Sequence, residues 1–176
     1  VVIISDAMRY EVGRSLFEKL QADAKCTTSI SAMQSVLPSY TKFGMAALLP
    51  HNTIEVLPDS RTLADGKPTD DIKQREAVLQ AANPDSRCVK YDDIKSMNVS
   101  ALRDVFTGQN VVYVYHDQID ARGDHASTEN EVFNACEEAV EEIYFLVRKL
   151  TSSANTIHYI ITADHGFIYK RDKLSE

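Results

Sequence analysis

Three apolar runs in this sequence are each followed by acidic or histidine side chains, the residue types that bind divalent metal ions in proteins. The runs cover residues 1–5, 110–115 and 157–162. The polar residues that follow them are Asp6, His116, Asp117, Asp120, Asp164 and His165. Because carboxylate oxygens and imidazole nitrogens together suit zinc and related ions, the pattern predicts a metal site. His116 and Asp117 would support the ligands rather than bind the ion.

Asp6 and the turn Asp164-His165-Gly166 are the sharpest of these candidates. Asp6 suits the cap of a helix that begins near Ala7 equally well, since Asp is among the best capping residues. Asp164 and His165 offer an oxygen and an imidazole nitrogen at one turn, where Gly166 permits an unusual backbone conformation. A turn with an incidental histidine is the alternative interpretation.

Thr41 lies near the start of a predicted helix over residues 40–49. A hydroxyl there feels the positive end of the helix dipole, and a bound cation would lower its pKa further. Thr41 is therefore a candidate nucleophile, and an ordinary first-turn threonine is the competing interpretation.

The polar stretch from Asp120 to His125 holds further candidates. Asp120 with Asp124 or His125 could bind a second cation, and the Arg122 guanidinium could bind a phosphate through its forked N–H donors. A solvated polar loop is the alternative.

Strand and helix patterns alternate along the chain, which predicts an α/β fold with a mostly parallel central sheet flanked by helices. The predicted strands cover residues 1–5, 27–31, 53–57, 87–91, 110–115 and 157–162. The predicted helices cover residues 10–22, 40–49, 71–82, 100–106 and 129–150. Residues 58–70 and 116–127 carry loop signals. Ligands of such sheets bind beyond the carboxyl ends of the strands, so we expect the polar side chains to converge there.

The composition is that of a folded domain: 176 residues, 44% hydrophobic and 26% charged, with a formal net charge of −7. It excludes a disordered chain, and no apolar run approaches the ~18 residues that span a bilayer. The net negative charge argues against a protein that binds nucleic acids without sequence specificity. Three cysteines far apart in the sequence predict a reduced, cytoplasmic protein. Because Val1 already lies in an apolar run, we expect a single domain over residues 1–176, cut at both ends from a longer protein.

Four segments together resemble the alkaline phosphatase superfamily and, within it, the PglZ domain. They cover residues 4–11, 37–50, 114–124 and 162–167, in family order over nearly the whole chain. Other acid-based families fit less well. A haloacid-dehalogenase-type phosphatase needs a second Asp where Met8 stands, and the glycine pattern of a P-loop or Rossmann fold is absent.

The resemblance implies an alkaline-phosphatase-like fold and a hydrolase with two divalent cations, usually Zn²⁺, with Mn²⁺ or Mg²⁺ as alternatives. The residues that match the ligands of one cation are Asp6, Thr41, Asp164 and His165. Thr41 also matches the nucleophile, which attacks a phosphate ester and forms a phospho-threonine intermediate. Asp120 matches the first ligand of the other cation.

Two departures from the superfamily pattern concern that second cation. The superfamily places a histidine four residues after the aspartate that matches Asp120, whereas Asp124 stands there and His125 follows. We expect His125 to be the ligand, with Asp124 as the alternative. The superfamily also uses a later histidine, and none follows His165 here.

We therefore expect a metal-dependent phosphatase or phosphodiesterase whose substrate is a phosphate ester, nucleotides and nucleic acids included. PglZ-like proteins are associated with BREX-type phage defence, and related domains with bacterial regulatory proteins. The resemblance thus implies that other defence proteins are the partners and that the protein does not bind a membrane. A non-catalytic interaction module of a defence complex is the alternative. A phosphomutase that uses the same site is a third interpretation.

Overall fold

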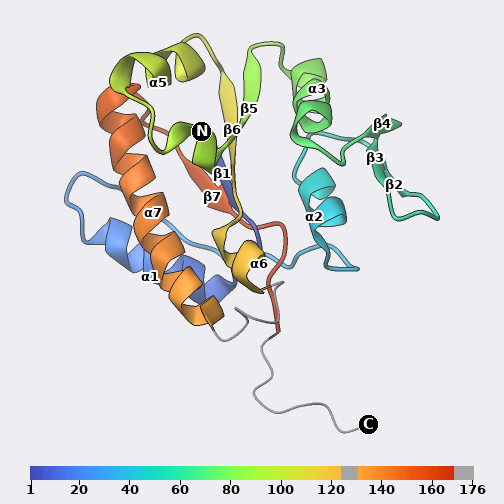
Figure 1. Ribbon diagram of the computed structural model, residues 1–176, viewed down its shortest axis with the longest axis horizontal. Helices are drawn as coiled ribbons and strands as arrows, with labels where there is room; N and C mark the ends of the chain where they lie inside the picture. The colour runs from blue at the N-terminus through green and yellow to red at the C-terminus, as the bar shows by residue number, and fades with distance from the viewer. Residues whose placement is uncertain (124–130, 169–176) are drawn as a thin grey trace, which may run out of the picture.

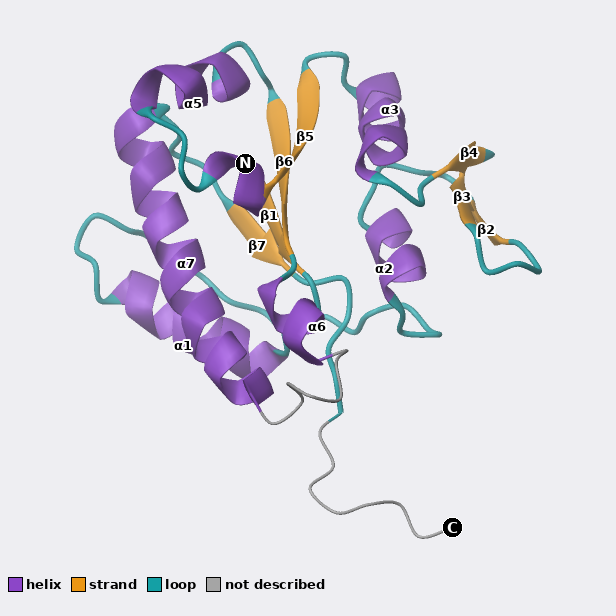
Figure 2. Ribbon diagram, viewed as in Figure 1, coloured by secondary structure: helices purple, strands orange, loops and turns teal. Residues whose placement is uncertain are grey.

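The central sheet of this chain has four parallel strands, which the computed structural model arranges in the order β5-β6-β1-β7 (Figures 1 and 2). The structure describes residues 1–123 and 131–168. The strands are β1 (Val2–Ser5), β5 (Ser86–Lys90), β6 (Val111–His116) and β7 (Ile160–Thr162). The predicted α/β class, with a mostly parallel sheet flanked by helices, is confirmed.

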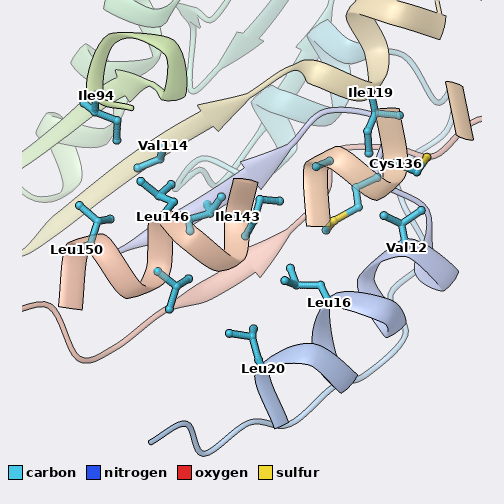
Figure 3. Packing of buried hydrophobic residues seen from close by; sticks show 14 of the residues in the cluster. Val12, Leu16, Leu20, Ile94, Val114, Ile119, Cys136, Ile143, Leu146 and Leu150 are labelled. Atoms are coloured by element: carbon cyan, nitrogen blue, oxygen red, sulfur yellow. The ribbon is translucent and has the colours of Figure 1, made fainter. Parts of the chain in front are cut away.

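Amphipathic helices cover one face of this sheet. They are α1 (Tyr10–Gln21), α5 (Val99–Phe106) and α7 (Val132–Ser153). In α1 the buried residues Val12, Leu16 and Leu20 recur every four positions, so they form one apolar stripe that packs with Ile143 and Leu146 of α7 (Figure 3). Each such buried aliphatic side chain contributes roughly 1.5–3 kcal/mol, and the stripe fixes α1, which follows Asp6, against the sheet.

Two helices, α2 (Thr41–Ala47) and α3 (Ile72–Ala82), cover the opposite face (Figure 2). Met45 of α2 and Leu79 of α3 pack in one cluster with Ile4 and Tyr115 of the sheet. This packing places the first residue of α2, Thr41, next to the carboxyl ends of the central strands.

A small antiparallel sheet lies beyond α2 and α3, in the order β2-β3-β4. Its strands are β2 (Ile54–Val56), β3 (Thr62–Ala64) and β4 (Lys67–Pro68). The predicted loop over residues 58–70 is therefore wrong over residues 62–68, which form this hairpin. Asp65 and Gly66 both have positive φ, 47° and 75°, as a two-residue hairpin turn requires.

Three other segments differ from the sequence prediction. Residues 27–31, predicted as a strand, belong to no strand. The stretch after β6, predicted as irregular, begins with helix α6 (Gln118–Gly123), and a short helix, α4 (Tyr91–Ile94), follows β5 directly. None of the helices in the described part of the chain is both long and apolar enough to cross a membrane.

Candidate functional site

The carboxyl ends of β1, β6 and β7 lie side by side. Ser5 of β1 is in register with His116 of β6, and Ile4 is in register with Thr162 of β7. Beyond these pairs the backbone N–H of Asp6 donates to the His116 carbonyl oxygen at 2.7 Å. The polar residues that follow the three strands therefore meet at one edge of the sheet, as the sequence predicts.

The turn after β1 holds Asp6 in a buried position, with 6% of the residue exposed. Ala7 has a φ of 60°, a left-handed conformation that costs a non-glycine residue about 1–3 kcal/mol. Its backbone N–H donates to Asp164 Oδ1 at 3.3 Å. Helix α1 begins only at Tyr10, and its N-terminal cap residue is Arg9. Asp6 is therefore not the cap of α1, and its turn faces the segment after β7 instead.

Helix α2 packs directly against the Asp164 turn at Gly44. A Cβ atom on Gly44 would lie 2.7 Å from the Asp164 carbonyl oxygen, so only glycine allows this approach. Asp164 itself is 2% exposed. Gly166 lacks the unusual backbone conformation predicted for it, since its φ is not among the positive values. The close approach at Gly44 brings Thr41, one helical turn earlier, to His165.

The His165 imidazole connects the three acidic and hydroxyl side chains. Its Nε2 lies 3.1 Å from Thr41 Oγ1, 3.3 Å from Asp6 Oδ1 and 3.5 Å from Asp164 Oδ2. On the other side of the ring, Nδ1 lies 2.9 Å from the Gly166 carbonyl oxygen. A carbonyl only accepts, so Nδ1 carries the proton of the neutral ring. Nε2 then presents a lone pair, to which the Thr41 hydroxyl donates.

This arrangement concentrates electron-rich atoms in a buried space. Asp6 Oδ1 and Asp164 Oδ2 are buried and accept no hydrogen bond from the described residues. Burial, followed by the Asp164 and Asp120 charges, raises the pKa of Asp6 to about 8. Burial also raises the pKa of Asp164, and a protonated His165 would oppose that shift. Two desolvated carboxylates beside an imidazole lone pair would gain stability from a cation.

The residues present fit a divalent metal ion. Ligand atoms of Asp6, Asp120 and His165 all lie within 4.8 Å of one another. Asp120 comes from α6, so segments that follow two different strands supply the oxygens. Oxygen and imidazole ligands are a set that zinc accepts, and manganese accepts it as well.

The remaining predicted site residues, Arg122, Asp124 and His125, are not among those that the structure places around His165. Arg122 forms an ion pair with Glu138 of α7. His125, the predicted ligand of a second cation, and its alternative Asp124 lie outside the described residues.

His116 has a larger supporting role than its sequence position suggests. It is fully buried, with Nδ1 3.1 Å from Ser5 Oγ and Nε2 2.9 Å from Glu142 Oε2. These contacts tie the ends of β1 and β6 to the middle of α7. Sequence reasoning missed Glu142 because it lies among other glutamates on α7, a pattern typical of a solvated helix face.

A cavity of about 350 Å³ opens in front of Asp6 and Thr41. Arg75, Tyr115 and His116 also line it. Arg75 comes from α3, a helix in which sequence reasoning identified no site residue. A larger cavity of about 950 Å³ borders His165 between α1, residues 25–35 and β7.

Comparisons with known proteins agree with the motif pattern. A family model described as "BREX system PglZ alkaline phosphatase-like domain" matches residues 1–176. "Alkaline phosphatase-like protein PglZ" of Bacillus cereus (strain H3081.97) is 46% identical over 173 residues. "Alkaline phosphatase-like protein BrxZ" of Escherichia coli O9:H4 (strain HS) is 39% identical over 176 residues. These matches cover 98% and 99% of this chain but only 20% of each relative, so the chain spans about a fifth of their length. No solved structure matches.

Proposed function

This chain belongs to the PglZ family of BREX-system alkaline phosphatase-like domains, and we propose that it hydrolyses phosphate esters with Thr41 as the nucleophile. One observation carries the proposal. The Thr41 hydroxyl, at the mouth of a cavity, donates a hydrogen bond to an imidazole that also faces two buried carboxylates. A structural threonine at the start of a helix has no need of such surroundings.

The residues around Thr41 would support this chemistry by holding the His165 ring in a fixed orientation. The Nδ1–H of His165 donates to the Gly166 carbonyl oxygen and thereby turns Nε2 toward the site. Asp6, Thr41, Asp164 and His165 would hold one cation, and Zn²⁺ is our first choice, with Mn²⁺ or Mg²⁺ as alternatives. When bound, a divalent cation would lower the pKa of the Thr41 hydroxyl and offset the charge of the substrate. A second cation would use Asp120 with His125 or Asp124.

The reaction has two balanced halves. Thr41 Oγ1 forms a bond to phosphorus while the bond to the ester oxygen breaks, and the Thr41 proton reaches the departing alcohol through solvent. Water then attacks the phospho-threonine and restores the hydroxyl; this step releases inorganic phosphate from a monoester substrate and a phosphate monoester from a diester substrate.

The test uses the full-length parent protein loaded with zinc. We expect cleavage of p-nitrophenyl phosphate or bis(p-nitrophenyl) phosphate, and we expect Thr41→Ala to reduce it to background with the metal content retained in part. Thr151→Ala is the matched control, because the Thr151 hydroxyl bonds within α7 and to Tyr159. Metal-loaded protein that cleaves neither ester, or a Thr41→Ala variant as active as Thr151→Ala, would overturn the proposal.

The family description also supports a cellular setting. We propose that the parent protein works in the cytoplasm, in phage defence, together with other proteins of a BREX system. The description of the family names the BREX system, and the two relatives are PglZ and BrxZ proteins, which supports this context. A phosphate ester of a nucleotide or nucleic acid is the substrate class that this context favours.

A further inference from the structure

Arg75 lines the cavity in front of Thr41, but the proposed reaction gives it no role. Its side chain lines the same 350 Å³ cavity as Asp6 and Thr41. Arg75 therefore shares this cavity with the proposed nucleophile, on the side that α3 supplies.

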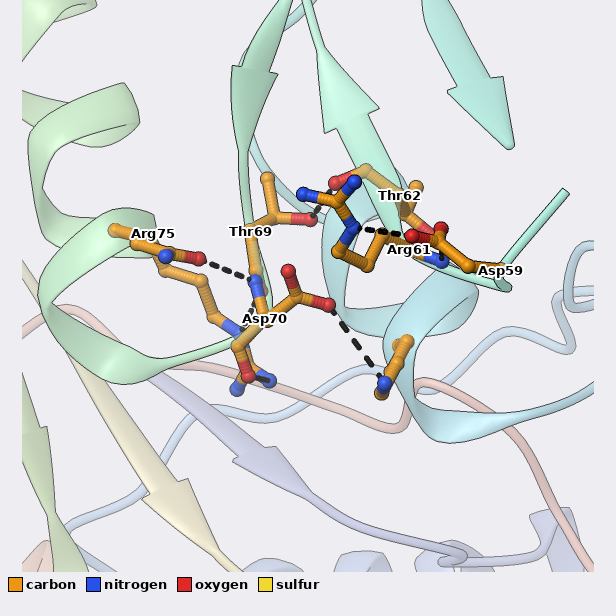
Figure 4. Close-up of polar contacts among 8 residues, drawn as sticks. Asp59, Arg61, Thr62, Thr69, Asp70 and Arg75 are labelled. Atoms are coloured by element: carbon orange, nitrogen blue, oxygen red, sulfur yellow. Dashed lines mark hydrogen bonds and ion pairs between the residues drawn. The ribbon is translucent and has the colours of Figure 1, made fainter. Parts of the chain in front are cut away.

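Neutral groups hold this guanidinium in place (Figure 4). Nε donates to the Thr69 carbonyl oxygen at 2.9 Å, and Nη2 donates to the Asp70 carbonyl oxygen at 3.3 Å. The guanidinium also lies over the face of the Tyr115 ring, with Arg75 Cζ 5.1 Å from the ring centroid. Within the described part of the chain, Nη1 donates to no protein atom, and the Asp70 carboxylate pairs with Lys42 rather than with Arg75. Arg75 thus forms no ion pair with the described residues and has a donor at Nη1 available to a ligand.

The charge of Arg75 is unusual for this cavity. The acidic residues that line it are Asp6, Asp70, Asp71, Asp92 and Asp117. The basic residues that line it are Arg75 and Lys90, and Lys90 is exposed. An anionic substrate that approaches Thr41 needs an attractive group on this wall, and Arg75 is the one that is already oriented.

We propose that Arg75 binds the phosphoryl group of the substrate, donating from Nη1 to a non-bridging oxygen, which stays on phosphorus when the ester bond breaks. A guanidinium matches the spacing of phosphate oxygens, and its orientation by two carbonyls removes the need to order it on binding. The proposal rests on the proposed function. It assigns to Arg75 the phosphate-binding role that sequence reasoning gave to Arg122, whose guanidinium pairs with Glu138.

A purely structural role is the competing explanation, because Arg75 also fastens α3 to residues 69–70. Gln74 supplies the matched control. Its Oε1 accepts from the Asp70 backbone N–H at 2.8 Å, so Gln74→Ala removes a contact to the same segment. Gln74 does not line the cavity. A structural effect should appear in both variants, whereas loss of phosphate binding should appear only at Arg75.

The experiment measures binding of inorganic phosphate to the zinc-loaded full-length protein by calorimetry, with kcat and KM for both p-nitrophenyl esters. We expect Arg75→Ala to weaken phosphate binding by about tenfold or more, and Arg75→Lys to weaken it less, since lysine keeps the charge but not the fork. KM should rise for both esters. The rise should be larger for the monoester, whose phosphoryl group carries more charge. Gln74→Ala should match the wild type.

The two proposals can fail separately, because phosphate binding needs no turnover. A protein that binds phosphate through Arg75 but cleaves no ester would refute the proposed function and keep this inference. Arg75→Ala and Arg75→Lys variants with the phosphate affinity of Gln74→Ala would overturn the inference. If Arg75→Ala does not fold, an Arg75→Lys variant with wild-type affinity and KM is sufficient to overturn it.

Discussion

A single methyl group at Gly44 should damage the site more than it damages the fold. A Cβ there would lie 2.7 Å from the Asp164 carbonyl oxygen, whereas ordinary contact begins at 3.4 Å, so α2 and the turn must separate by about 0.7 Å. The opposing atoms belong to the Asp164 backbone and Cβ, so no side-chain rotation can relieve the clash. Thr41 moves with α2 and His165 moves with the turn, so the separation stretches their hydrogen bond.

The two consequences of Gly44→Ala differ in size. Overpacking costs about 1–3 kcal/mol, and alanine in place of glycine within a helix returns about 1 kcal/mol. The free energy of unfolding should therefore fall by only about 0–2 kcal/mol. A displacement approaching an ångström can lower the rate of a positioned reaction by about a hundredfold, so we expect kcat/KM to fall by about 10- to 100-fold.

The assay compares Gly44→Ala with Gly13→Ala in the zinc-loaded full-length protein. A Cβ on Gly13, within α1, meets nothing within 4 Å. Gly13→Ala should leave hydrolysis and metal affinity unchanged and stabilise the protein by about 0.5–1 kcal/mol. Chemical denaturation, metal titration and ester hydrolysis give the three readings. Gly44→Ala protein with wild-type hydrolysis and metal affinity would refute the close packing of α2 on the Asp164 turn.

Three further predictions concern stability. In chelator-treated protein the free energy of unfolding should fall as pH rises from about 4 to 8, because the folded state holds the Asp6 proton up to a pKa of about 8 and the unfolded state releases it near 3.8. Asp6→Asn should flatten that slope in urea denaturation, and an unchanged slope would contradict the burial of Asp6. His116→Ala should cost about 2–3 kcal/mol in the same assay, because it leaves the Glu142 carboxylate without its partner, whereas Glu142→Gln should cost less. Asp71→Ala should cost about 1 kcal/mol, since the Asp71 side chain caps α3, and an equal loss in Asp70→Ala would argue against that cap.

The sequence was sufficient for the central sheet because its strands carry their own signal. A strand buried on both faces reads as a continuous apolar run, and β1 and β6 lie within two such runs. Their carboxyl ends must then share an edge, which is why Asp6, Asp120 and Asp164 could be expected together from the sequence alone. The strand predicted over residues 27–31 failed for the complementary reason: its residues favour extended structure, but no neighbouring strand pairs with them.

Residues that act through tertiary contacts could not be found in the same way. Nothing adjacent in sequence distinguishes Arg75 from the other polar residues of α3, and only the packing of α3 on Tyr115 directs it into the cavity. The hairpin of β3 and β4 did carry a readable signal. Asp65-Gly66 is a favoured two-residue turn, but the strands beside it are too short to alternate visibly.

The strain at this site bears on the choice between an enzyme and an interaction module. Ala7 holds a left-handed conformation, and two buried carboxylate oxygens, of Asp6 and Asp164, lack hydrogen bonds from the described residues. Each feature destabilises the metal-free fold, and an asparagine or a glycine would remove it at little cost to packing. A domain that only presents a surface to partners has no use for such features in its interior. A bound cation would offset the carboxylate repulsion, so the same features that weaken the empty fold favour a metal-dependent catalyst.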